Sequence, residues 1–152
     1  MKRIILFEKF EGKINIKSPL PPGKSLIFFD GVCGLCNGFV DFIIKIDKDN
    51  EFVFSPLQGE FARKNLPEKF TKDMKSVVLL KPDGELYTQS DAVIEILSEI
   101  GGVWGLAKVA NILPSGLRDK AYDLVSENRY KIFGKKESCR MPIGDERTKF
   151  IM

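Results

Sequence analysis

Apolar and polar positions follow a strand pattern and then a helix pattern from residue 26 onward. Residues 26–29 are an unbroken apolar run (LIFF), which is typical of a strand buried on both faces. Apolar side chains in residues 33–47 surround one polar stripe, whose members recur every three or four positions: Asn37, Asp41, Lys45 and, just beyond, Lys48. This spacing predicts an amphipathic helix. Residues 51–57 (EFVFSPL) predict a second strand that ends near Pro56.

Turn and cap signals divide the next part of the chain into four more elements. They are a short helix at 59–65, strands at 76–80 and 85–88 joined by the turn Pro82-Asp83-Gly84, and a helix that begins at Ser90 or Asp91 and ends before Gly101-Gly102. Helical connections make the first strands parallel, and the tight turn makes the last pair antiparallel. The order β-α-β-α-β-β-α is that of the thioredoxin fold. We therefore predict an α/β domain with a thioredoxin-like architecture.

The last third of the chain is expected to be a C-terminal helical extension of this fold. Residues 104–113 are almost wholly apolar and predict a buried segment that ends at Pro114. Ser115 is the expected cap of a helix over 117–133, which Gly134 would end. The predicted organisation is an N-terminal extension with a short hairpin (1–25), a domain that includes the C-terminal helices (26–143), and a polar tail (144–152).

Composition indicates one globular domain and excludes several kinds of chemistry. The 152 residues are 43% hydrophobic and 30% charged, and the mixed charges leave a net charge of +3, which favours neither nucleic acid nor membrane insertion. The chain has no histidine, which excludes Ser-His and Cys-His nucleophilic pairs and histidine-based zinc hydrolases. The apolar run after the first three residues is too short for a signal peptide, and no apolar stretch is long enough to span a membrane. We therefore expect a cytoplasmic protein.

Cys33 and Cys36 lie where the first predicted strand passes into the first predicted helix. Disulfide exchange requires a thiolate, and the unpaired N–H groups and the dipole at a helix N-terminus stabilise one. Two cysteines three positions apart in a first helical turn can also approach closely enough to form a disulfide. We predict that Cys33, at the helix tip, attacks a substrate disulfide and that Cys36 resolves the mixed disulfide. Such exchange needs no bound cofactor and no metal.

Two other interpretations of this cysteine pair stay open. Cys33 and Cys36 would form part of a zinc or iron–sulfur site with Cys139, if a carboxylate or a second chain supplied a fourth ligand. Alternatively, both are inert core residues. Cys139 itself is either a third redox thiol or a lone cysteine packed under a loop.

Four further residues are candidates for the site. Asp30 ends the first strand, at the sheet edge where α/β proteins place their sites, and it is either an acceptor for the proton of Cys36 or a turn residue. Backbone N–H groups at Ser90 and Asp91 would hold the carboxylate of a small thiol such as glutathione, although helix capping alone explains these residues. The basic residues around Arg129 indicate nucleic-acid binding only weakly, because helix C-termini favour such cations in any case.

The run at 28–37 (FFDGVCGLCN) resembles the signature of the DCC family, also called DUF393, which is named for its Asp-Cys-Cys motif. Shorter matching motifs extend the resemblance over about residues 26–143: FSPLQ at 54–58, SVVL at 76–79, YTQSDA at 87–92, LRD at 117–119, NRY at 128–130 and CRMP at 139–142. The resemblance implies a thioredoxin-like fold with Asp30, Cys33 and Cys36 as motif residues, and it makes Arg129 and Cys139 stronger candidates. Thioredoxins carry a cis-proline just before the third strand, whereas this chain has Met74-Lys75-Ser76 there.

The sequence thus predicts an enzyme, a thiol-disulfide oxidoreductase that acts on a thiol or disulfide of a protein or a small molecule. The rival prediction is a non-catalytic metal-binding or protein-interaction module that uses Cys33, Cys36 and Cys139.

Overall fold

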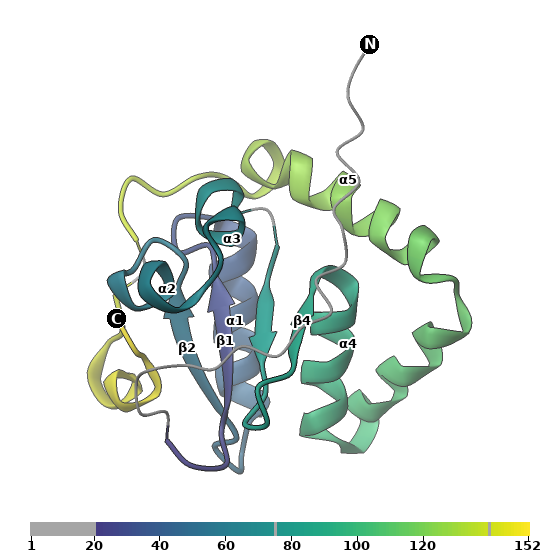
Figure 1. The fold of residues 1–152 in the computed structure, drawn as a ribbon, viewed down its shortest axis with the longest axis horizontal. Helices are drawn as coiled ribbons and strands as arrows, with labels where there is room; N and C mark the ends of the chain where they lie inside the picture. The colour runs from purple at the N-terminus through teal and green to yellow at the C-terminus, as the bar shows by residue number, and fades with distance from the viewer. Residues whose placement is uncertain (1–20, 75, 140) are drawn as a thin grey trace.

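The computed structural model describes residues 21–74, 76–139 and 141–152. Its elements in chain order are β1 (Ser25–Phe29), α1 (Gly34–Ile46), β2 (Phe52–Pro56), α2 (Glu60–Asn65), α3 (Glu68–Asp73), β3 (Val78–Leu80), β4 (Leu86–Thr88), α4 (Gln89–Ile100), the 3-10 helix η1 (Gly102–Ile112), α5 (Ser115–Phe133) and the 3-10 helix η2 (Gly144–Lys149). Figure 1 shows these elements around one sheet. The hairpin expected before residue 20 lies outside the described residues.

The strands form a four-stranded sheet of order β2-β1-β3-β4. β1 pairs parallel with β2 and antiparallel with β3, and β3 pairs antiparallel with β4. This mixed α/β architecture is consistent with a thioredoxin-like fold, so the predicted fold class is confirmed. The parallel register places Phe29 opposite Pro56, which brings the carboxyl ends of β1 and β2 to one edge of the sheet.

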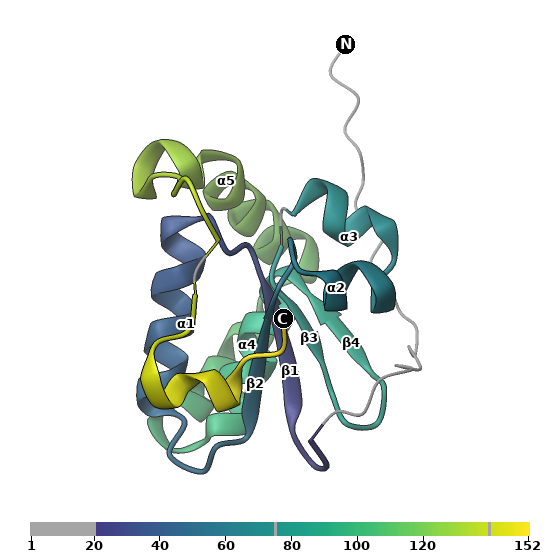
Figure 2. The same ribbon diagram turned by 90° about the vertical axis from the view of Figure 1, so that its left-hand side faces the viewer.

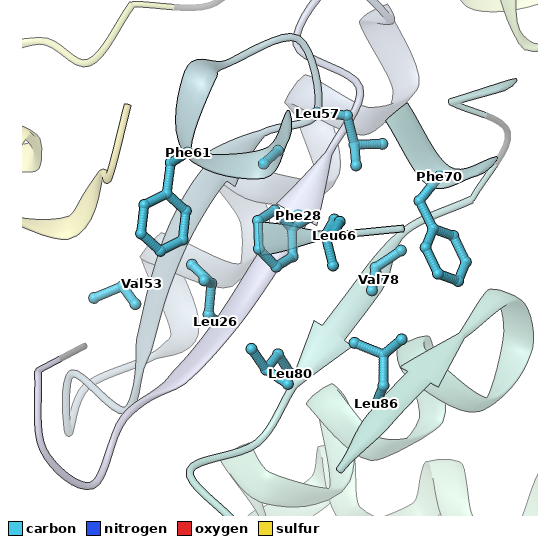
Figure 3. Packing of buried hydrophobic residues seen from close by; sticks show 11 residues of the cluster. Leu26, Phe28, Val53, Leu57, Phe61, Leu66, Phe70, Val78, Leu80 and Leu86 are labelled. Atoms are coloured by element: carbon cyan, nitrogen blue, oxygen red, sulfur yellow. The ribbon is translucent and has the colours of Figure 1, made fainter. Parts of the chain in front are cut away.

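Two helical layers enclose the sheet (Figure 2). On one face, α2 and α3 cover a core cluster that contains Leu26, Phe28, Val53, Leu57, Phe61, Ala62, Leu66, Phe70, Val78, Leu80 and Leu86 (Figure 3). On the other face, α1 and α4 cover a second cluster that contains Ile27, Phe29, Val40, Ile43, Phe52, Phe54, Val77, Leu79, Ala92, Ile96 and Phe150. The run at 26–29 is apolar throughout because it lies in a central strand, whose side chains alternate between two covered faces of the sheet.

The end of the chain returns to the sheet, which the sequence does not predict. Phe150 is buried in the second core cluster, where its ring lies 6.2 Å from that of Phe29 and 5.5 Å from that of Phe54. The Ile151 N–H donates to the Phe54 carbonyl at 2.8 Å. Residues 150 and 151 thus cover the outer edge of β2.

The segment that follows α4 is not buried, so the prediction of a buried apolar element there was wrong. None of the residues of η1 is buried, and Leu106 and Ile112 are 69% and 82% exposed. Both faces of the sheet are already covered by other helices, which leaves no core for η1 to join. Within the described ranges, no helix combines the length and the apolar content needed to cross a bilayer.

Helix α5 buries polar residues and exposes apolar ones, the reverse of the usual arrangement in an amphipathic helix. Leu117, Leu124 and Ile132 are more than half exposed, whereas Ser126 and Arg129 are buried. The helix begins after Pro114, and no side chain caps it, so the expected Ser115 cap is absent from these described residues. The inverted pattern has a structural cause: α5 packs on the polar edge of the sheet, beside Asp30, rather than on an apolar face.

Candidate active site

The cysteine motif occupies the tight connection between β1 and α1. Cys33 is the N-cap residue of α1, with the extended φ and ψ of −81° and 126° that a cap position requires. Its carbonyl accepts the first helical hydrogen bond, from Asn37 N–H at 3.0 Å. The side chain of Cys33 therefore lies at the N-terminal end of the helix, as predicted.

Asn37 holds this connection in shape. Its Nδ2 donates to the carbonyls of Gly31 and Cys33, both at 2.9 Å, and the residue is only 2% exposed. The sequence assigns Asn37 to the polar stripe of an amphipathic helix, and that expectation was wrong. A buried amide is stable here because it satisfies the Gly31 carbonyl, which lies outside the helix, and adds a second hydrogen bond to the Cys33 carbonyl.

The two thiols lie in opposite electrostatic settings. The hydrogen bond from the Cys36 thiol lowers the pKa of Cys33 to about 6, against the effect of burial, and the N–H groups of Cys36 and Leu35 and the charge of Arg129 lower it further. The same hydrogen bond raises the pKa of Cys36, as do burial and the negative charges of Cys33 and Asp30. Cys33 is therefore the thiolate of the pair and Cys36 its proton donor.

Asp30 is the centre of a buried polar network at the carboxyl end of β1. Its Oδ1 accepts from Gln58 Nε2 at 2.6 Å and from the Val32 N–H at 3.1 Å. Its Oδ2 accepts from Arg129 Nη2 at 3.2 Å and from the Tyr130 hydroxyl. Burial and the hydrogen bond to Asp30 raise the pKa of Tyr130 to about 12, so Tyr130 remains a donor at neutral pH. Both carboxylate oxygens are thus held in place.

Arg129 links helix α5 to this network. Its Nη1 donates to the Ser126 carbonyl and hydroxyl at 2.7 and 3.0 Å, and its guanidinium lies 4.4 Å from the centre of the Tyr130 ring. Burial alone would lower the pKa of Arg129, but its hydrogen bond to Asp30 and its contacts with Tyr130 raise it. Arg129 therefore keeps its positive charge, although the residue is only 6% exposed.

Side chains of helix α5 also form hydrogen bonds with backbone groups just before β3, the position where thioredoxins carry their cis-proline. Arg129 Nη2 donates to the Met74 carbonyl at 3.0 Å, and the Val77 N–H donates to the Tyr122 hydroxyl at 3.0 Å. Burial raises the pKa of Tyr122 to about 12. This helix therefore covers the sheet edge beside the cysteines.

The two cysteines differ in how far solvent reaches them. Cys33 is 0% exposed, whereas Cys36 is half-buried and lines a cavity of about 150 Å³. The other lining residues, mostly apolar, come from α1, β3, α4 and α5 and their borders: Leu35, Phe39, Val77, Val93, Tyr122, Val125, Ser126 and Arg129. The cavity fits an apolar group next to the Cys36 sulfur atom.

Comparison with known proteins supports the family that the motif indicates. Residues 27–135 match the family model for DCC1-like thiol-disulfide oxidoreductases. The chain belongs to this DCC1-like family. It is 38% identical over 128 residues to the uncharacterized protein YuxK of Bacillus subtilis. The matched region covers 83% of this chain and 93% of YuxK. It is 36% identical over 121 residues to a chloroplastic DCC family protein of Arabidopsis thaliana. This match covers 78% of this chain and 70% of the plant protein. No solved structure matches the chain.

The motifs that resemble the DCC1-like family are far apart in sequence and meet in the structure. Gln58 from the FSPLQ motif and Arg129 and Tyr130 from the NRY motif all bind Asp30. The first family motif therefore depends on two others for its geometry.

Ser90 and Asp91, which the sequence offers as caps or as a carboxylate site, lie in the first turn of α4. The N-cap is Thr88, so the expectation that Ser90 or Asp91 caps the helix was wrong. The Ser90 hydroxyl donates to Asp119 at 2.5 Å, and Arg118 donates to Asp91 at 2.9 Å. Both side chains therefore join α4 to α5 and lie in a second DCC1-like motif pair, YTQSDA with LRD.

Cys139 lies beside the loop that precedes Cys33. A Cβ placed on Gly31 would lie 2.2 Å from Cys139 Sγ, which shows that the loop and the third cysteine are in direct contact. Among the residues that the structure describes, no group of three or more Cys, Asp or Glu side chains is arranged to hold a metal ion. No disulfide joins any of these three described cysteines.

Asn37, Gln58 and Tyr122 are site residues that the sequence alone does not indicate as candidates. Gln58 and Asn37 lie within the family motifs, so the resemblance could have identified them. Tyr122 gave no signal, because a tyrosine in a helix of mixed polarity is compatible with either an exposed or a buried position.

Proposed function

We propose that this DCC1-like protein is an enzyme that exchanges a dithiol for a disulfide through Cys33 and Cys36. The observation that carries the proposal is the Cys33 thiol at the N-terminus of α1, with a pKa lowered to about 6 by the adjacent Cys36. A thiolate at neutral pH is the species that attacks a disulfide.

The reaction proceeds in two balanced steps. The Cys33 thiolate attacks one sulfur of a substrate disulfide, the substrate S–S bond breaks, and the leaving sulfur takes up a proton. Cys36 then loses its proton and attacks the Cys33 sulfur, which releases the second substrate thiol and forms the Cys33–Cys36 disulfide. Two electrons pass to the substrate, and a second dithiol compound must reduce the protein for another cycle.

The surrounding network supports each step. Asp30 is the proposed acceptor for the Cys36 proton, since its charge acts on that thiol and its two oxygens are held in place. Arg129 balances the charge of Asp30 and favours the Cys33 thiolate. The cavity beside Cys36 would receive the apolar part of the substrate next to its sulfur. A reducing compartment such as the cytoplasm suits a protein whose three described cysteines form no disulfide.

Titration in glutathione buffers of graded redox ratio tests this proposal. The thiol content, measured by alkylation and mass spectrometry, should show one two-electron transition that joins Cys33 and Cys36. The transition should vanish in Cys33→Ser and in Cys36→Ser, and it should persist in the control Cys139→Ser. A wild-type protein that keeps both thiols free across the whole range would contradict the proposal.

A further inference from the structure

Cys33 is the proposed attacking thiol, yet it is fully buried in the resting protein. Residues 133–136, the last residue of α5 and the three that follow it, lie against the cysteine loop, and we call them the strap. Lys135 forms an antiparallel β-bridge with Cys33. The Gly34 N–H donates to the Gly134 carbonyl at 3.2 Å, and the Lys136 N–H donates to the Val32 carbonyl at 2.7 Å.

The contact between strap and loop is made through backbone and depends on the absence of a side chain at Gly34. A Cβ at this position would lie 2.2 Å from the Phe133 carbonyl oxygen, well inside any allowed contact. Gly38, in the next turn of the same helix, has nothing within 4 Å of an added Cβ. The close approach is therefore a local feature of the loop at 32–34.

Backbone groups that pair with an extended segment are the means by which many proteins bind peptides as an added strand. In this chain, the groups before β3 at Met74 and Val77 are already bonded to α5. Val32 and Gly34, next to the reactive sulfur, instead pair with an exposed segment, residues 134–136. Outside the loop this segment contacts Tyr130: the Gly134 N–H donates to the Tyr130 carbonyl at 3.1 Å, and the Lys135 ammonium lies 5.2 Å from the Tyr130 ring.

We propose that the strap is an internal stand-in for an extended polypeptide substrate. It covers Cys33 in the resting protein, and a substrate segment replaces it by pairing with Val32 and Gly34, which places the substrate disulfide at the Cys33 sulfur. This inference rests on the proposed function, because it assigns the first attack to Cys33. It names the substrate class, an extended peptide, and the event that exposes the thiol.

Substitution of the strap provides the first test. Lys136→Pro removes the N–H that bonds Val32 and leaves the loop intact, whereas Lys136→Ala removes only the side chain and is the matched control. Loss of one backbone hydrogen bond should make strap opening about five- to tenfold more frequent. Iodoacetamide should therefore alkylate Cys33 in Lys136→Pro faster by that factor, and reduced Lys136→Pro should reduce insulin disulfides faster in a single turnover.

Substitution of the loop separates a stand-in from a simple cover. Gly34→Ala should expel the strap and speed alkylation of Cys33, but it should slow insulin reduction, because the same Cβ obstructs an incoming peptide backbone. Gly38→Ala, on the same helix, should match wild type in both rates. Thermal melts followed by circular dichroism establish that each variant is folded.

The outcomes distinguish the inference from the proposed function. Unchanged alkylation in Lys136→Pro, or equal acceleration of alkylation and insulin reduction in Gly34→Ala, would overturn the stand-in. Alkylation that responds as expected in a protein that reduces neither insulin nor a small disulfide would uphold the cover and contradict the proposed exchange.

Discussion

Cys33 and Cys36 lie within one turn of α1, yet their surroundings act on them in opposite directions. The N-cap position and the Cys36 thiol favour a thiolate at Cys33, while that negative charge and burial keep Cys36 protonated. At the scale of single residues, the pair therefore shares one proton, which stays on the Cys36 sulfur and leaves Cys33 as the thiolate. Sequence spacing predicts which sulfur is at the helix tip, and the structure adds the network around Asp30 that completes this asymmetry.

The pH dependence of the thiolate follows from this asymmetry. Ultraviolet absorbance of the reduced protein should show one thiolate forming with a midpoint near pH 6, and this step should be missing in Cys33→Ser. Because the pKa of Cys33 is lower in the folded protein than in the unfolded chain, ionisation stabilises the fold at high pH. This contribution should disappear as the pH falls from about 9 through about 6. A midpoint near that of a free cysteine would contradict the assignment.

At the scale of elements, α5 completes the site, because it supplies Arg129 and Tyr130, which bind Asp30. Its buried side is polar, because Arg129 and Ser126 point to the sheet edge where Asp30 lies. Ser90 and Asp91 fasten the start of α4 to the same helix. A helix of this kind cannot be oriented from its apolar spacing, since most of its apolar residues, such as Leu117, Leu124 and Ile132, face outward.

Replacement of Arg129 tests the polar attachment of α5. Arg129→Met leaves the Asp30 carboxylate buried without its cation, which should cost about 3–5 kcal/mol of unfolding free energy. Lys131→Met removes an exposed cation from the same helix and should change stability by less than about 0.5 kcal/mol. Urea denaturation followed by tryptophan fluorescence and circular dichroism measures both. Equal effects of the two substitutions would show that Arg129 contributes no more to the unfolding free energy than an exposed cation does.

At the scale of the whole molecule, the chain is closed by its last residues. Phe150 packs against Phe29 and Phe54 in the core beside α1, and Ile151 pairs with β2. The C-terminus therefore protects an edge strand that would otherwise present unpaired backbone groups. This contact lies within residues 144–152, for which the sequence predicts a polar tail.

Phe150→Ala tests how much the packing of these last residues contributes to the unfolding free energy. Loss of a buried phenylalanine that touches two core rings should lower the unfolding free energy by about 3 kcal/mol. Met152→Ala, at a half-exposed position two residues later, should have little effect. If both variants denature at the same urea concentration as wild type, the C-terminal residues do not contribute to the core.

The order of elements from β1 to α4 and the position of the cysteine pair were determined by the sequence alone, apart from the short helix α3 (Glu68–Asp73), which no pattern in the sequence indicated. They depend on local properties: the apolar run at 26–29, the helical stripe after Cys33, and the turn at 82–84. Such properties act between residues that are neighbours in the chain, so a single sequence displays them.

Other features were decided only by tertiary structure. The burial of Asn37 and Arg129, the exposure of η1 and the strap across Cys33 depend on which segments meet after folding. Arg129 is 99 residues from Asp30 in sequence, and neither residue type signals a buried position. Apolar periodicity reports which side of a helix avoids water, and it fails for α5 because that helix packs through an ion pair and hydrogen bonds.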